Sequence, residues 1–174
     1  VTHHAGIIDE GNSKTASWGD FDNDGFLDLY IANWSCYPKC GRPMDGDTDH
    51  LYHNNGDGTF DNVTDYLGGG VNGAGFVASF TDFDNDGDPD IYLVNDEFIN
   101  PVGNKLWRND GPGCDGWCFK QIAVEAGAAG GFSPSIRWNP SARAVRRSVP
   151  TCLPMAAVTG ALVTVVEADD TSLT

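Results

Sequence analysis

The sequence predicts an all-β fold made of two four-stranded antiparallel units, and three observations lead to this prediction. The chain holds 22 glycines among 174 residues, with frequent Asn and Asp, which is typical of many tight turns. An acidic stretch at residues 20–28 returns 62 residues later at residues 82–90. Runs of apolar, β-branched and aromatic residues follow both stretches, at 29–31 and 91–93, and favour strands there.

In the first unit we expect strands at residues 15–18, 27–32, 50–53 and 60–64. The first two strands flank the acidic stretch. The last two are joined by Asn-Asn-Gly-Asp-Gly at residues 54–58, which suits a tight turn between antiparallel strands.

In the second unit we expect strands at residues 76–80, 89–94, 105–108 and 118–123. Leu-Trp-Arg-Asn-Asp-Gly at 106–111 answers Leu-Tyr-His-Asn-Asn-Gly at 51–56, at an offset of 55. The loops between the second and third strands, 34–49 and 96–104, absorb the difference from the offset of 62.

The repeat is longer than its acidic stretch. Gly6 matches Gly68, Gly11 matches Gly73, Tyr30 matches Tyr92 and Asn33 matches Asn95. A third copy begins at residues 122–127, which resemble residues 1–6, but residues 141–147 contain no aspartate. The tail, residues 128–174, is therefore a different module, a partial unit or capping strand built on 161–167, or the product of a reading-frame change, and the sequence leaves these alternatives open.

Each acidic stretch carries carboxylates at positions 1, 3, 5 and 9 and glycine at position 6. Four carboxylates converge only around a cation, and hard oxygen ligands suit calcium. Position 12, the bidentate glutamate of an EF-hand, is Ile31 in one copy and Leu93 in the other. The alternative interpretation is an ordinary solvated turn, which two copies in one register disfavour. The expected ligands of two calcium sites are Asp20, Asp22, Asp24, Asp28 and the Phe26 carbonyl, then Asp82, Asp84, Asp86, Asp90 and the Asp88 carbonyl.

Residues 1–127 resemble the FG-GAP or VCBS repeat, through the D-x-D-x-D-G-x-x-D stretch, the strand ending in Asn, the L-Y/W-x-N-x-G run and the F-x-x-V-T strand. The resemblance implies a β-propeller with four-stranded blades, here at about 12–66 and 72–126. It also implies calcium in the loop between the first and second strands of each blade, as in integrin α-subunits, and ligands bound elsewhere.

Two blades leave sheet faces and edges uncovered, whereas propellers close with about 4–8 blades. We therefore expect either the remaining blades of a longer chain or self-association. A net charge of −15 argues against nucleic acid as a partner. The sequence has no apolar run of 18 residues, so we expect no membrane span.

The five cysteines form two close pairs and one single residue, Cys152. Each pair lies in a loop rich in Gly, Pro and Asp, which favours local disulfides in an oxidising compartment, Cys36 with Cys40 and Cys114 with Cys118. A shared four-cysteine zinc site is the alternative. Sequons for N-glycosylation at Asn33 and Asn62 also favour a secreted or cell-surface location.

The function we expect is a non-catalytic, calcium-stabilised module for binding or assembly, with a protein or glycan ligand. No histidine lies in a nucleophile or zinc signature, and the metal loops already explain the clear carboxylate clusters. The alternatives are a lectin, in which Trp34 and Tyr37 stack on sugar rings, and a polysaccharide-active enzyme such as a lyase, which the resemblance also admits.

Overall fold

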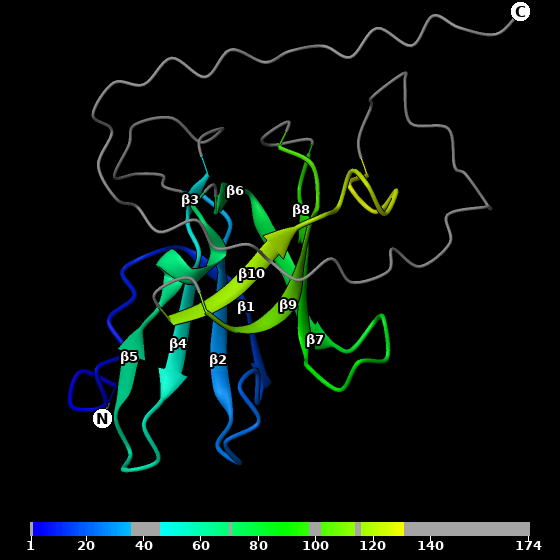
Figure 1. Cartoon of the computed structure of the whole chain (residues 1–174). Coiled ribbons are helices and arrows are strands. Elements are labelled where there is room, and N and C mark those ends of the chain that lie inside the picture. The colour runs from blue at the N-terminus through cyan, green and yellow to red at the C-terminus, as the bar shows by residue number, and fades with distance from the viewer. Residues whose placement is uncertain (1, 36–45, 70, 98–101, 114–115, 131–174) are drawn as a thin grey trace, which may run out of the picture.

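A computed structural model of the chain describes residues 2–35, 46–69, 71–97, 102–113 and 116–130 (Figure 1). These residues form two four-stranded antiparallel sheets, and no α-helix occurs among them. The all-β, propeller-type fold expected from the sequence is confirmed. We call each four-stranded sheet a blade.

The first blade has the strand order β1-β2-β4-β5. Its strands are β1 (Ser13–Gly19), β2 (Asp28–Asn33), β4 (His50–Asn54) and β5 (Phe60–Asn62). The turn between β4 and β5 has positive φ at Gly56 and Gly58, 74° and 91°, where glycine is the least strained residue.

The second blade has the order β10-β9-β8-β7. Its strands are β7 (Gly75–Thr81), β8 (Asp90–Asn95), β9 (Lys105–Gly113) and β10 (Gly116–Gln121). All eight strands expected from the sequence therefore form, close to their predicted bounds except for β9, which continues to Gly113 where the prediction ended at residue 108.

Three short elements were not predicted. β3 (Asp47–Thr48) pairs with β6 (Asn72–Gly73), and η1 (Thr64–Leu67) is a single 3-10 turn. The fourth strand of the first blade ends at Asn62, two residues earlier than expected, because Asn62 Oδ1 accepts hydrogen bonds from both the N–H and the hydroxyl of Thr64.

The two blades pack face to face around one apolar core, and their first strands lie side by side. Phe80 N on β7 donates to Ser17 Oγ on β1 at 3.3 Å. Large core side chains include Tyr30 and Leu51 from the first blade and Ile91 and Trp107 from the second, and all four are at most 1% exposed. Burial on this scale supplies most of the stability of a domain of this size.

The outer faces of both blades are covered only in part. Residues 2–8 lie on the first blade, where Ile7 packs against Leu29, Ile31 and Tyr52. The turn at 122–129 lies on the second blade, where Ile122 and Ala123 pack against Leu106. Both segments resemble the turn at 63–68 between the blades, and Gly6, Gly68 and Gly127 share positive φ of 81°, 71° and 70°.

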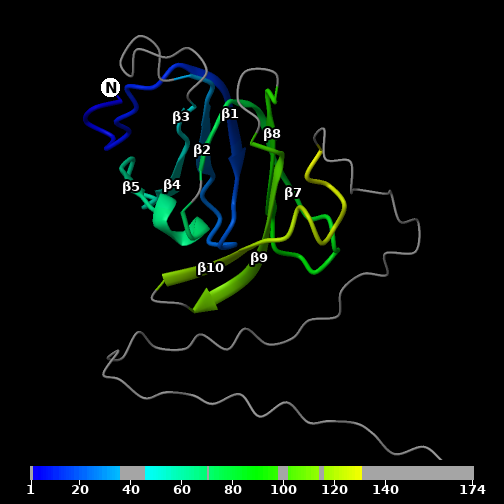
Figure 2. The same ribbon diagram turned by 90° about the horizontal axis from the view of Figure 1, so that it is seen from above.

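The β9–β10 hairpin reaches across to the first blade (Figures 1 and 2). Trp117 and Phe119 on β10 pack edge-on against Phe21, which belongs to the first acidic loop, with ring centroids 5.7 Å apart in both pairs. The second blade therefore covers the base of the first acidic loop.

Candidate metal centres

Both acidic loops join the first and second strands of a blade, as the sequence predicts. The loop between β1 and β2 and the loop between β7 and β8 share one backbone conformation. Asn23 and Asn85 both have φ of 59°, and Gly25 and Gly87 have φ of 93° and 96°. The glycine at the sixth position of each loop adopts positive φ with little strain. The fourth position also has positive φ, and asparagine is the non-glycine residue that tolerates it best.

The first carboxylate of each loop holds this conformation. Asp20 accepts hydrogen bonds from the N–H groups of Asp24 and Gly25, each at 3.0 Å. Asp82 accepts the equivalent bonds from Asp86 and Gly87, also at 3.0 Å. The first aspartate of each loop thus holds the loop backbone in its turn.

The ninth carboxylate of each loop links three parts of the blade. Asp28 accepts from Phe21 N at 2.9 Å and from Asn54 N at 2.9 Å. Asp90 does the same with Phe83 N at 3.0 Å and Asn109 N at 2.8 Å. Burial raises the pKa of both Asp28 and Asp90 to about 6, against the lowering effect of these N–H donors.

Three groups of side chains among the described residues could hold a metal ion. They are Asp20 with Asp22 and Asp28, Asp22 with Asp24 and His53, and Asp82 with Asp84 and Asp86, each with ligand atoms within 4.8 Å of one another. Burial and the nearby Asp24 raise the pKa of Asp22. A cation would relieve this accumulation of negative charge, so the donor set fits a hard divalent ion.

The groups contain seven of the eight predicted carboxylates. Asp90 belongs to none of them. The carbonyls of Phe26 and Asp88 remain predicted ligands.

The family model of the FG-GAP-like repeat matches residues 20–93, from the first aspartate of the first loop to the second strand of the second blade. Residues 20–93 form an FG-GAP-like repeat segment. Such repeats often bind Ca²⁺, are typically non-catalytic and occur in extracellular proteins. A comparison with curated proteins found no match.

Sequence reasoning missed two basic residues that lie beside the acidic loops. They are His53 on β4 of the first blade and Arg108 on β9 of the second blade. His53 Nε2 lies 2.9 Å from Asp22 Oδ2 and 3.7 Å from Asp24 Oδ2. Its repeat equivalent, Arg108, donates from Nε to Asp110 Oδ1 at 2.7 Å, which raises the pKa of Arg108. The repeat offset of 55 could have revealed this pair, because it places both residues on the third strand of their blades.

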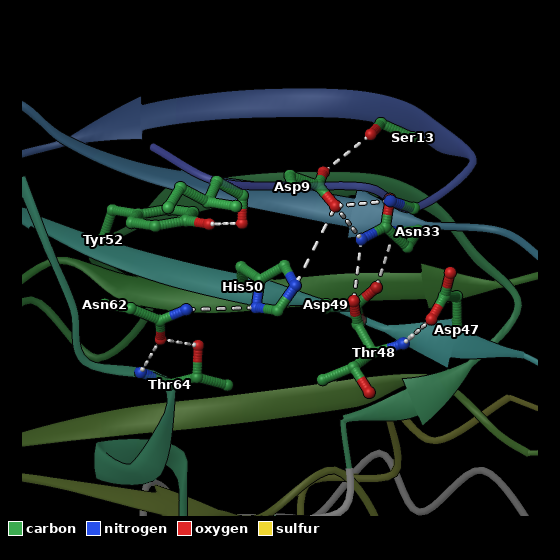
Figure 3. Close-up of polar contacts among 12 residues, drawn as sticks. Asp9, Ser13, Asn33, Asp47, Thr48, Asp49, His50, Tyr52, Asn62 and Thr64 are labelled. Carbon is green, nitrogen blue, oxygen red and sulfur yellow. Dashed lines mark hydrogen bonds and ion pairs between the residues drawn. The ribbon is translucent and has the colours of Figure 1, made fainter. Parts of the chain in front are cut away.

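A second polar network lies at the other end of β2 (Figure 3). Asp49 accepts from Asn33 N at 2.6 Å and from Tyr30 OH at 3.0 Å, and Asn33 Nδ2 donates to Thr48 O and Asp9 Oδ1. Burial raises the pKa of Asp49 to about 7. This network fixes the end of β2 and lies away from the acidic loops.

The other predicted contact residues have mixed outcomes. Trp34 is half-buried, donates from Nε1 to Asp96 Oδ2 at 3.2 Å, and has Lys14 Nζ 4.9 Å from its ring centroid. One face of its ring is therefore already occupied. Tyr37 lies outside the described residues.

The predicted glycosylation sites differ in access. Asn33 is fully buried and its amide nitrogen donates two hydrogen bonds, so a glycan there would disrupt the network, whereas Asn62 is exposed.

Cys118 is disulfide-bonded. The pairings Cys36–Cys40 and Cys114–Cys118 stay predictions, because Cys36, Cys40 and Cys114 are not among the described residues.

No helix of the described segments is long and apolar enough to cross a membrane.

Proposed function

We propose that the chain is a non-catalytic extracellular module in which two bound calcium ions stiffen propeller-type blades for binding and assembly. The observation that carries the proposal is the identity of the two acidic loops. They share φ values, the hydrogen bonds of their first and ninth aspartates, and clustered carboxylates. Two solvated turns without a common ligand are not expected to share these φ values, hydrogen bonds and carboxylate clusters.

Calcium suits these loops for a physical reason. Each brings at least three carboxylates together, and the ninth aspartate is buried with a pKa raised to about 6. A divalent cation lowers such pKa values and stabilises the folded chain by its binding free energy, because the unfolded chain has no formed site. The net charge of −15 repels itself in the folded chain, and bound cations reduce this repulsion.

The test is the melting temperature of the full chain with and without calcium. We expect a rise of several degrees at a calcium concentration about 100-fold above the Kd, equivalent to about 2.7 kcal/mol per site. Asp22→Ala with Asp84→Ala should abolish the rise, whereas the exposed Asp61→Ala should leave it. A chain whose melting temperature ignores both calcium and chelator would refute the metal assignment.

Assembly is supported by aromatic side chains that one blade buries and the other exposes. Phe80 packs in the core between the blades, but its repeat equivalent Trp18 is 52% exposed on the outer side of the first blade. Phe21 is 1% exposed, and its equivalent Phe83 is 39% exposed on the second blade. Trp18 and Phe83 therefore stand where a neighbouring blade would bury them.

The neighbour we propose is a second copy of the chain, joined head to tail so that its second blade meets the first blade of the next copy. Light scattering in calcium should give a mass above 18.6 kDa, the mass of one chain. Trp18→Lys should lower that mass, whereas Leu27→Lys, also exposed but in the acidic loop, should not. A uniform monomer of the unaltered chain would contradict the assembly.

A further inference from the structure

The two acidic loops differ in the basic group that the third strand places beside them. In the first blade this group is the imidazole of His53, on β4. Its Nε2 lies 2.9 Å from Asp22 Oδ2 and 3.7 Å from Asp24 Oδ2. The side chain is about a quarter exposed, so ions can reach it.

The other ring nitrogen of His53 also faces an oxygen. Nδ1 lies 3.3 Å from Asn55 Oδ1. The orientation of the Asn55 amide is set from its far end, because Nδ2 donates to Thr59 Oγ1 at 3.0 Å. A neutral imidazole has one N–H group and cannot donate to both sides. A metal ion bound at Nε2 leaves that single N–H group on Nδ1, where Asn55 Oδ1 can accept it, and it also neutralises the two carboxylates.

The spacing of these atoms also suits a small metal. Ligands about 2.0–2.1 Å from a tetrahedral zinc ion lie about 3.3–3.4 Å from one another. The two distances from Nε2, 2.9 Å and 3.7 Å, lie on either side of that value. Phe21 restricts the imidazole from the side, with ring centroids 5.9 Å apart and planes at 60°.

The second blade lacks this arrangement. At the equivalent positions of the second blade, Arg108 stands in place of His53 and Asp110 in place of Asn55, so both members of the contact differ. Arg108 Nε donates to Asp110 Oδ1 at 2.7 Å. A guanidinium is protonated at all relevant pH and cannot ligate a metal. The loop at Asp82, Asp84 and Asp86 thus offers oxygen ligands only.

We propose that His53, Asp22 and Asp24 give the first loop a site for a borderline transition-metal ion of the Zn²⁺ or Co²⁺ class, which the second loop does not have. Imidazole nitrogen favours such ions over calcium, whereas carboxylate and carbonyl oxygens alone do not. The inference rests on the proposed function in so far as the first loop is a metal site. It adds a second class of ion that competes with calcium for Asp22 and Asp24.

The experiment is a Co²⁺ titration followed by visible absorption, in a chain whose exposed His3 and His4 are replaced by Gln. We expect one site with a nitrogen-ligated Co²⁺ spectrum. His53→Gln should weaken Co²⁺ binding on the order of 100-fold while the calcium-induced rise in melting temperature persists. His50→Gln is the matched control, because His50 lies on the same strand with Asp9 at 3.9 Å, and it should leave the spectrum unchanged.

The outcomes separate this inference from the calcium proposal. An unchanged Co²⁺ spectrum in His53→Gln would overturn the inference and leave the calcium sites intact. A His53-dependent spectrum in a chain that ignores calcium would uphold the inference and refute the calcium proposal. In the unaltered chain, Zn²⁺ should shift the ¹⁵N resonance of His53 Nε2 and not that of Nδ1. An unshifted Nε2 resonance would also overturn the inference, whatever the stability of the variants.

Discussion

Asp49 in the first blade and Asn104 in the second blade occupy the same place in the repeat and make the same contacts. Asp49 Oδ1 accepts from Asn33 N, and Asn104 Oδ1 accepts from Asn95 N, at 2.6 Å and 3.0 Å. The second hydrogen bond joins the same two positions in opposite directions: Tyr30 OH donates to Asp49 Oδ2 at 3.0 Å, whereas Asn104 Nδ2 donates to Tyr92 OH at 3.2 Å. Both residues therefore hold the end of the second strand of their blade, Asp49 with a carboxyl group and Asn104 with an amide.

Asp49→Asn should stabilise the chain above neutral pH. Burial raises the pKa of Asp49 from 3.8 to about 7. The folded chain then keeps a proton that the unfolded chain releases, so this group makes folding less favourable as pH rises from 3.8 to about 7. We expect the variant to gain about 1–2 kcal/mol at pH 8 and to lose this part of the pH dependence. Urea unfolding in saturating calcium at pH 5 and pH 8 measures both effects.

The reciprocal change is the control. Asn104→Asp should lower stability at pH 8 more than at pH 5, because it places a second acid in the equivalent, partly buried position. Equal losses at the two pH values would show that the pKa of an acid at position 104 is not raised. No gain at pH 8 from Asp49→Asn would contradict the raised pKa of Asp49.

Asp28→Ala should destabilise the chain even without calcium. Its carboxylate is fully buried and accepts from two backbone N–H groups, those of Phe21 and Asn54. Losing a buried acceptor costs about 1–3 kcal/mol. Asp22→Ala, which removes a more exposed carboxylate, should cost less than 1 kcal/mol in chelator and act mainly when calcium is present. Thermal unfolding of both variants in chelator gives the comparison, and equal losses would contradict a structural role for Asp28.

Asn109→Leu should weaken the contact between the blades. Asn109 is fully buried, and its Nδ2 donates to Phe21 O in the first acidic loop and to Pro89 O in its own blade. Its Oδ1 accepts from Gly111 N and Trp117 Nε1. Leaving these groups without partners should cost about 2–4 kcal/mol.

The matched control for Asn109 is Asn54→Leu. Asn54 is the repeat equivalent, but its amide contacts are exposed and stay within the first blade, to Leu27 O and Gly56 N. We expect a loss of less than about 1 kcal/mol. If both variants lose the same free energy of unfolding in urea, the bond from Asn109 to Phe21 contributes nothing between the blades.

The strands and the acidic loops could be predicted because their signals are local. Apolar runs, turn residues such as Asn-Gly, and the aspartate spacing each lie within about ten residues. The repeat then located the second copy of each. The family comparison, at residues 20–93, and the two observed blades agree with that reasoning.

The contacts between repeats could not be predicted in the same way. Phe21 and Phe83 are identical residues at one position of the repeat, yet only Phe21 is buried, because Trp117 and Phe119 of the second blade cover it. His53 and Arg108 differ in sequence and acquire a role only once β4 and β9 are placed beside the loops. Such differences depend on which neighbour each copy has, and a repeat pattern does not contain this information.

Gly19→Ala should disturb the packing of β7 on β1. A Cβ at Gly19 would lie 2.3 Å from Cγ of Phe80, so one of the two residues must move, at a cost of about 1–3 kcal/mol. Thr81 is the repeat equivalent of Gly19 and carries a side chain on the exposed side of the second blade, so the strand itself tolerates one. Thr81→Ala should therefore change stability by less than about 0.5 kcal/mol.

In the double variant with Phe80→Ala, the effect of Gly19→Ala should nearly vanish, giving a coupling free energy of about 0.5–3 kcal/mol between the two sites. Additive losses in urea unfolding would show that Gly19 is required by its own strand and not by the neighbouring blade.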